Sequence, residues 1–206
     1  MNCTTCNAEL KSGSATCLEC GAAVSAAPAV PKDRVFGDWV NLAVRIIKRE
    51  DAAVEEAARD PNATMFACLF LVIAAAAPSL GSLAIFAFLF MVPGVLIATA
   101  IGLGIIHLVA TALGGKGEYV QLFRVNGLAQ MLGWVNAVPF LGPIVGIFAM
   151  LYGIAVNVNN VRVLYKMPLS HAIAVVVLPV LLVLGFVITV AVVFGGVFLA
   201  MVSHAH

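Results

Sequence analysis

Four of the five cysteines lie within the first twenty residues, in two closely spaced pairs. Cys3 and Cys6 form the first pair, Cys17 and Cys20 form the second, and ten residues separate the pairs. Each C-x2-C pair can hold one edge of a tetrahedral Zn²⁺ ion, and Gly21 suits a tight turn after the second pair. The spacing predicts a structural zinc ribbon over residues 1–21, in which four thiolates fill the coordination shell.

Two other interpretations of the four cysteines remain. Two disulfides would need an oxidising compartment, whereas the charge pattern described below places this segment in the cytosol. A redox C-x-x-C motif would need a surrounding βαβ pattern, which the sequence lacks. Because about twenty residues cannot bury a core, zinc would supply most of the folding free energy. The fifth cysteine, Cys68, lies in an apolar run, and we expect it to be a small buried hydrophobe.

The composition indicates a protein of the lipid bilayer. Of the 206 residues, 63% are hydrophobic and 10% are charged, whereas an ordinary soluble domain has about 25% charged residues. No basic stripe with interleaved aromatic residues occurs, which argues against a nucleic-acid partner. The first thirty residues lack the features of a cleavable signal peptide, so we expect the first hydrophobic helix to direct insertion.

Residues 22–32 are small residues with prolines and predict a semi-flexible linker. Residues 33–61 mix charged and apolar residues at the helical period, which predicts one or two amphipathic helices. Such a segment lies on the membrane surface, with Trp39 at the level of the lipid headgroups, or packs against the cytosolic ends of a helix bundle. The sequence favours neither arrangement.

Residues 62–206 predict an all-α integral membrane bundle with five transmembrane helices. The first span covers about residues 63–77 and ends at Pro78-Ser79. We expect a kink in the second span at Pro93-Gly94, and the short link 139–143 turns the chain between spans three and four. Spans two to five lie within residues 81–113, 119–138, 143–161 and 169–202.

The basic residues fix the orientation of these spans. Seven of the eleven Lys and Arg residues precede residue 61, and the other four lie in the loops after spans two and four. The remaining two loops carry no charge. With five spans, all the basic residues fall on one side, so the positive-inside rule predicts a cytoplasmic N-terminus and a C-terminus outside.

The polar residues of the membrane part do not form a catalytic or ion-conducting set. No acidic or basic residue lies clearly at mid-membrane depth, which argues against a pump or a proton-coupled carrier. We expect the two histidines to contact a partner at the cytosolic interface. We expect Asn157, Asn159 and Asn160 to cap the end of span four or to bond across helices. The segment Gly114–Gly117 lacks the spacing of a phosphate loop. The polar residues are His107, Asn126, Gln130, Asn136, Asn157, Asn159, Asn160 and His171.

Small residues at four-residue spacing predict close packing of spans three and four. Gly142 and Gly146 open span four, and Gly133 and Ala137 form a similar pair in span three. These faces would also allow a homo-oligomer.

Short motifs in a particular order resemble the Yip/YIPF family of five-span membrane proteins. They are the run from His107 to a Gly-Gly turn ending at Gly117, the segment Tyr119–Arg124, the link Pro139–Gly142, and the stretch from Val161 to Ala174. The resemblance implies five spans, a cytosolic N-terminus and a non-enzymatic role. Eukaryotic relatives are linked with Rab-type GTPases and vesicle traffic. The four-cysteine segment is instead similar to ribbons on prokaryotic membrane proteins, so we expect a prokaryotic plasma membrane and no Rab-linked role.

Two functional hypotheses follow. The first is an adaptor or membrane organiser that contacts the lipid bilayer and presents the zinc ribbon to a protein partner at the cytosolic face. The alternative is a passive channel or small-solute transporter, which the proline-containing spans two and five suggest.

Overall fold

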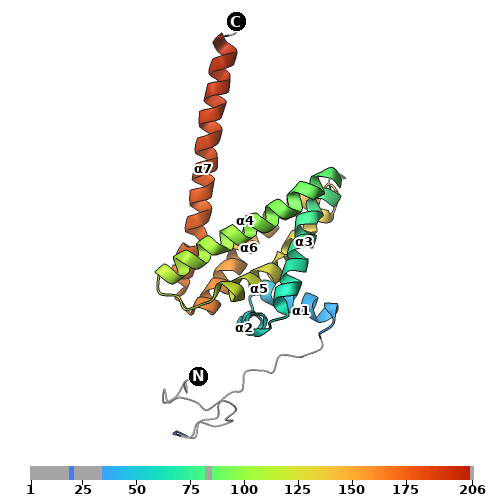
Figure 1. Cartoon of the computed structure of the whole chain (residues 1–206), viewed down its shortest axis with the longest axis vertical. Helices are drawn as coiled ribbons and strands as arrows, with labels where there is room; N and C mark the ends of the chain where they lie inside the picture. The colour runs from blue at the N-terminus through green and yellow to red at the C-terminus, as the bar shows by residue number, and fades with distance from the viewer. Residues whose placement is uncertain (1–18, 21–33, 82–84, 205–206) are drawn as a thin grey trace. The chain divides into compact units, whose positions relative to one another are not determined.

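The computed structural model describes residues 19–20, 34–81 and 85–204, and the regular secondary structure of these residues is all helical (Figure 1). The chain divides into two units, Met1–Asp33 and Arg34–His206. The second unit contains α1 (Phe36–Ile47), α2 (Asp51–Arg59), α3 (Ala63–Gly81), α4 (Ile85–Ala112), α5 (Tyr119–Ala129), the 3₁₀ helix η1 (Gln130–Ala137), α6 (Gly142–Tyr165) and α7 (Leu169–His204). The predicted linker and most of the predicted zinc ribbon lie outside the described residues.

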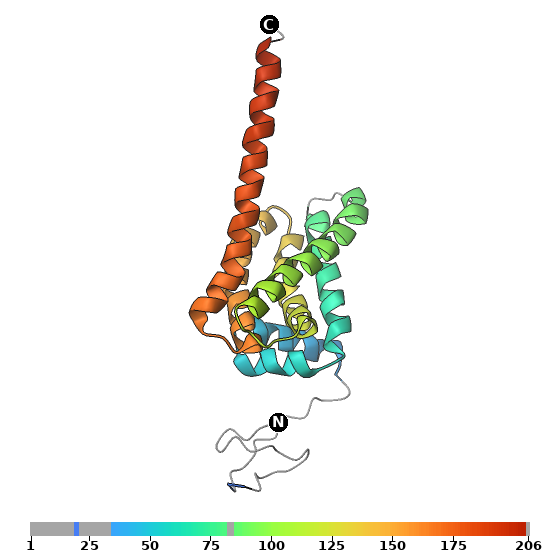
Figure 2. The same cartoon turned by 60° about the vertical axis from the view of Figure 1, so that its left-hand side comes forward.

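The amphipathic segment forms two helices that pack against the bundle. Arg49, with φ 63°, takes a left-handed conformation in the turn that separates α1 from α2. The buried face of α1 carries Trp39, Leu42, Ala43 and Ile46, and that of α2 carries Ala53, Val54, Ala57 and Ala58. These faces contact α5 and α6, while α2 and α3 meet at 110° and lie crosswise in Figure 2. The predicted packing against the bundle is therefore present, and it is compatible with a position at the membrane surface.

Trp39, which the surface arrangement would place among the lipid headgroups, packs inside the protein. Its side chain is only 1% exposed, and its ring stacks on Phe66 of α3 with a centroid distance of 4.5 Å. Trp39 belongs to the apolar stripe of α1, which packs mainly on α5, and Phe66 of α3 stacks on its ring. An amphipathic pattern identifies such a stripe but does not say whether lipid or protein covers it.

The longer helices match the predicted spans in order and approximate position. Helix α3 continues through Pro78 to Gly81 instead of stopping at the proline. Helix α4 also contains a proline, Pro93, and Figures 1 and 2 both show it as one continuous helix. The prolines therefore do not end either helix.

Small residues set the distances between the central helices. A Cβ atom added at Gly127 of α5 would overlap Ala67 of α3, and one added at Gly133 would lie 3.2 Å from the Cβ of Ala74. Gly146 of α6 faces Asn136 of η1 in the same way. The predicted close packing of spans three and four is therefore present at Gly146, whereas Gly133 packs against α3.

Two described helices are long and apolar enough to cross a membrane, within Leu89–Ala112 and Ile144–Tyr165. A third candidate joins α2 to α3 across their bend. Its α2 part carries Asp51, Glu55, Glu56 and Arg59, and charged side chains are unfavourable inside a bilayer. Large apolar side chains, such as Phe90 on α4 and Phe148 on α6, are 82% and 68% exposed. Lipid would cover them in a bilayer.

Candidate functional site

The predicted metal site lies almost wholly outside the described residues. Cys3, Cys6 and Cys17 are not described, and Cys20 is exposed in a short turn. Within residues 19–20, 34–81 and 85–204, no three His, Cys, Asp or Glu side chains gather closely enough to hold a metal. The zinc site therefore stays a prediction.

Cys68 is exposed on α3, so the prediction that it is buried is wrong. Helix α3 is apolar all round. In a membrane helix of this kind, the sequence does not distinguish side chains that face lipid from those that face protein.

We call α1, α2 and the turn between them (36–59) the platform. Arg34, one of the first described residues of the second unit, anchors it. The Arg34 side chain is 5% exposed and forms an ion pair with Glu56. Its Nε lies 3.8 Å from the Asp60 carboxylate, and its guanidinium lies 5.0 Å from the centre of the Trp39 ring. A buried cation held by two carboxylates and an aromatic face fixes the start of the second unit.

A second arginine ties the two platform helices together. Arg45 Nε lies 2.9 Å from Glu50, and Arg45 Nη1 lies 2.9 Å from Glu56. The hydrogen bond to Glu50, followed by the one to Glu56, raises the pKa of the Arg45 guanidinium. Glu56 thus accepts hydrogen bonds from both Arg34 and Arg45.

Arginines from the bundle also contact the platform. Arg124 of α5 donates to the Ala58 carbonyl at 2.9 Å, and Arg162 near the end of α6 pairs with Asp51 at 2.7 Å. The charge pattern placed both arginines on the side of the N-terminal segment, and these contacts confirm that they share its face of the bundle. The pattern did not reveal that they bond to it directly.

The family-like motifs meet at a cluster around Tyr165, at the end of α6. The Tyr165 hydroxyl lies 2.6 Å from His107 Nδ1 of α4, and the side chain is only 1% exposed. A Cβ atom at Gly117 would lie 2.9 Å from the Tyr165 ring, so the glycine turn lies flat against the tyrosine. His107 was expected to contact a partner, and its observed contact is within the chain. His171 is exposed at the start of α7.

Asparagines form a buried link between α5 and α6. Asn160 Nδ2 donates to Asn126 Oδ1 at 3.0 Å, and these residues are 0% and 3% exposed. Asn159 donates instead to Asp51 of the platform at 3.3 Å. The predicted bond across helices is therefore confirmed for Asn160.

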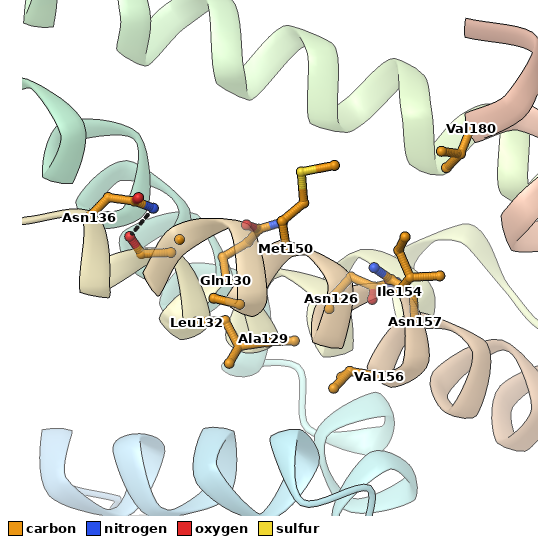
Figure 3. Close-up of a pocket in the computed structure, with 14 residues that line it drawn as sticks. Asn126, Ala129, Gln130, Leu132, Asn136, Met150, Ile154, Val156, Asn157 and Val180 are labelled. Atoms are coloured by element: carbon orange, nitrogen blue, oxygen red, sulfur yellow. Dashed lines mark hydrogen bonds between the residues drawn. The ribbon is translucent and has the colours of Figure 1, made fainter. Parts of the chain in front are cut away.

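A pocket of about 350 Å³ lies between α5, η1, α6 and α7. Its polar lining consists of the amides of Asn126, Gln130, Asn136 and Asn157, and no charged side chain lines it. Figure 3 shows Asn136 at one end, with Asn126 and Asn157 toward the other. The sequence marked these amides as polar residues within spans, but their separation along the chain hid their convergence on one pocket.

The ion pairs and hydrogen bonds described above can hold the helices together, and the amide-lined pocket can bind an uncharged group. A protein-family model described as the Yip1 domain matches residues 45–192, which are 148 of the 206 residues. No curated protein and no solved structure matches the chain. The matched region begins within α1 and ends within α7, so it includes most of the platform, the Tyr165 cluster and the pocket, and excludes the four-cysteine segment.

Proposed function

The chain belongs to the Yip1-domain family, and we propose that it is a non-enzymatic membrane organiser that recruits a protein partner through an N-terminal zinc ribbon. The family match supports a membrane protein of the trafficking type and not a catalyst. The ribbon and the partner are our extension of it.

Five apolar segments support a five-span arrangement: α3, α4, α5 with η1, α6, and α7. At about 1.5 Å per residue, the 19 residues of α3 reach ~28 Å, close to the ~30 Å hydrocarbon core. The eight residues of η1 rise ~2.0 Å each, so α5 and η1 together reach ~33 Å. The 3₁₀ conformation thus lengthens the third segment to membrane width.

The proposed orientation has the platform in the cytoplasm and the C-terminus outside, in a prokaryotic plasma membrane. Arg124 and Arg162 support it because both contact α2, together with the bases of the platform itself. Basic residues near span ends stay preferentially in the cytoplasm.

The anchoring of Arg34 is the observation that carries the adaptor proposal. The predicted linker, residues 22–32, ends two residues before this buried arginine. A module on that linker would be attached to a rigid base instead of a free helix end. The C-x2-C spacing of Cys3, Cys6, Cys17 and Cys20 supports a zinc ribbon as the module.

In-cell crosslinking followed by affinity capture tests this proposal. The natural chain is compared with a variant carrying Cys→Ser at Cys3, Cys6, Cys17 and Cys20, at equal membrane levels. Cys68→Ser is the matched control, because Cys68 is an exposed cysteine of α3. We expect one zinc per chain in the natural protein and the control, and none in the fourfold variant.

We also expect a crosslinked partner that the fourfold variant loses and the control keeps. Identical crosslink profiles for all three proteins, with zinc absent from the fourfold variant, would rule out recruitment by the ribbon. Zinc retained by the fourfold variant would rule out the ribbon itself.

A further inference from the structure

The pocket beside α6 contains amide groups whose hydrogen-bonding capacity the described residues do not use. Asn126 is 3% exposed, and its Oδ1 accepts the bond from Asn160. Its Nδ2 has no partner within the described parts of the chain, and neither has Asn157 Oδ1. Both residues line the pocket. Buried amide atoms without a partner destabilise a protein, so they point to a bound molecule that completes them.

The lining restricts the charge of that molecule. All its polar side chains are amides, without an acidic or basic group. An ion would lose its hydration without gaining an opposite charge, which is strongly unfavourable. The molecule must therefore be uncharged.

The lining also requires both a donor and an acceptor from the molecule. Asn126 offers Nδ2 as a donor, and Asn157 offers Oδ1 as an acceptor. If the side-chain amides of Asn126 and Asn160 are both rotated by half a turn, donor and acceptor exchange places in the bond between them. Asn126 then has an unused acceptor, Oδ1, instead of an unused donor. A hydroxyl or an amide supplies both functions and fits either orientation.

The rim indicates the side from which the molecule enters. Met150 and Val180 line the pocket and are 67% and 42% exposed. On the same helix as Met150, Ile147 and Leu151 are 61% and 57% exposed, and all three belong to a candidate membrane span. The opening is thus bordered by exposed apolar side chains, which lipid would cover in a bilayer.

We propose that this pocket binds the uncharged, hydroxyl- or amide-bearing end of a membrane lipid, whose acyl chain lies along the exposed face of α6. A volume of about 350 Å³ is at the low end for ligand pockets, which span about 300–1,000 Å³. It suits a small headgroup with the first part of a chain.

Lipid binding to the purified full chain in micelles, measured by native mass spectrometry, tests the proposal. The probe is 1-oleoylglycerol, which carries two hydroxyls. Methyl oleate keeps the chain without a donor, oleate adds a charge, and glycerol lacks the chain. We expect saturable binding of 1-oleoylglycerol alone.

Three variants locate the binding. Asn157→Leu removes one acceptor and should weaken binding about fivefold, as the loss of one neutral hydrogen bond does. Ala149→Phe fills the pocket and should abolish binding without touching an amide. Gln121→Leu is the matched control, because it replaces an amide of α5 outside the pocket lining and should leave binding unchanged. Each variant is first checked for a monodisperse, natural-like elution profile.

Several outcomes would overturn the proposal. Equal binding of methyl oleate would show that the amides select nothing, and glycerol binding as tightly as 1-oleoylglycerol would identify a free polyol as the ligand. Binding that survives Ala149→Phe would lie elsewhere on the protein. If Asn157→Leu does not fold, Ala149→Phe and the methyl oleate comparison still decide the question.

Discussion

Gly127 determines how closely α5 can approach α3. A Cβ atom at this position would overlap the Cβ of Ala67 and lie 2.9 Å from its Cα. Backbone cannot yield as a flexible side chain can, so we expect Gly127→Ala to lower the free energy of unfolding by about 1–3 kcal/mol, as overpacking does. The measurement is thermal unfolding of the purified protein in detergent.

Gly102→Ala is the matched control for this substitution. Gly102 lies within α4, and a Cβ atom added there would meet nothing within 4 Å. Its unfolding midpoint should stay the same or rise slightly, because alanine is the better helix former. Equal midpoints for both variants would show that the α3–α5 contact is looser than described.

The hydrogen bond between Tyr165 and His107 can be tested by Tyr165→Phe. The tyrosine is 1% exposed, so water cannot replace the lost hydroxyl at the ring nitrogen. We expect a loss of about 1 kcal/mol in unfolding free energy. Tyr152→Phe is the control. The Tyr152 hydroxyl donates to the Ile47 carbonyl at 2.9 Å, but Tyr152 is 40% exposed, so water can replace the lost hydroxyl. A larger loss from Tyr152→Phe would contradict this assignment.

Residue types were easier to predict than their partners. The sequence identified Asn126, Asn157 and Asn160 as polar groups inside spans, and one of the two roles foreseen for the Asn157–Asn160 segment, a bond across helices, is present. It did not pair His107 with Tyr165, because 58 residues separate them and each lies in a motif of its own. Convergence of this kind depends on helix packing, which local periodicity does not contain.

The two platform helices depend on one buried ion pair more than on the exposed ones. In Arg34→Ala, Glu56 and Asp60 would lose their shared cation, and the Asp60 side chain is only 1% exposed. An unpaired buried charge costs about 3–5 kcal/mol, and we expect the low end because Glu56 is 22% exposed. The readout is faster amide hydrogen exchange in α1 and α2, with a lower unfolding midpoint.

Arg59→Ala is the control for Arg34→Ala. Arg59 pairs with Glu55 at 2.5 Å, and their side chains are 45% and 52% exposed. An exposed pair of this kind contributes at most about 0.5 kcal/mol, so exchange in the platform should be nearly unchanged. Equal effects of the two substitutions would mean that Arg34 is not the anchor.

The sequence predicted helices well where an apolar pattern is long. It predicted them poorly where contacts between helices determine the local conformation. Helices α4 and α6 lie where long apolar runs predicted them, because the length of such a run matches the bilayer thickness. The change from α5 to η1 has no such signal, because Gln130–Ala137 reads as a continuation of an apolar helix. It forms where Gly133 packs on Ala74 and Asn136 bonds the Gly133 carbonyl at 3.0 Å.

At the scale of the second unit, four arginines of the described residues gather on one face of the bundle. Arg34, Arg45, Arg124 and Arg162 all make their contacts with the platform or its flanking residues. The sequence predicted this grouping from loop charges and helix count, without knowledge of any contact. The charge pattern of the sequence and the contacts in the structure agree for a physical reason. The carboxylates that pair with these basic residues lie on or next to the amphipathic helices, on the same side of the bundle.

This arrangement makes a testable prediction about topology. Phe140, in the link before α6, is 92% exposed, and Lys116, in the glycine turn after α4, is also exposed. In the proposed five-span arrangement, with the platform in the cytoplasm, one span (α5 with η1) separates these two positions, so they lie on opposite sides of the membrane. Each is replaced by cysteine in a Cys68→Ser background, and intact cells are treated with a membrane-impermeant maleimide.

We expect Phe140→Cys to react in intact cells and Lys116→Cys to react only after permeabilisation. The Cys68→Ser protein without a new cysteine measures the labelling of the ribbon cysteines alone. These cysteines should also stay unlabelled until the membrane is permeabilised. Reaction at Lys116→Cys alone would show the opposite orientation, in which the basic residues lie outside, against the usual bias. Reaction at both positions in intact cells would require an even number of spans between them and would contradict the five-span arrangement.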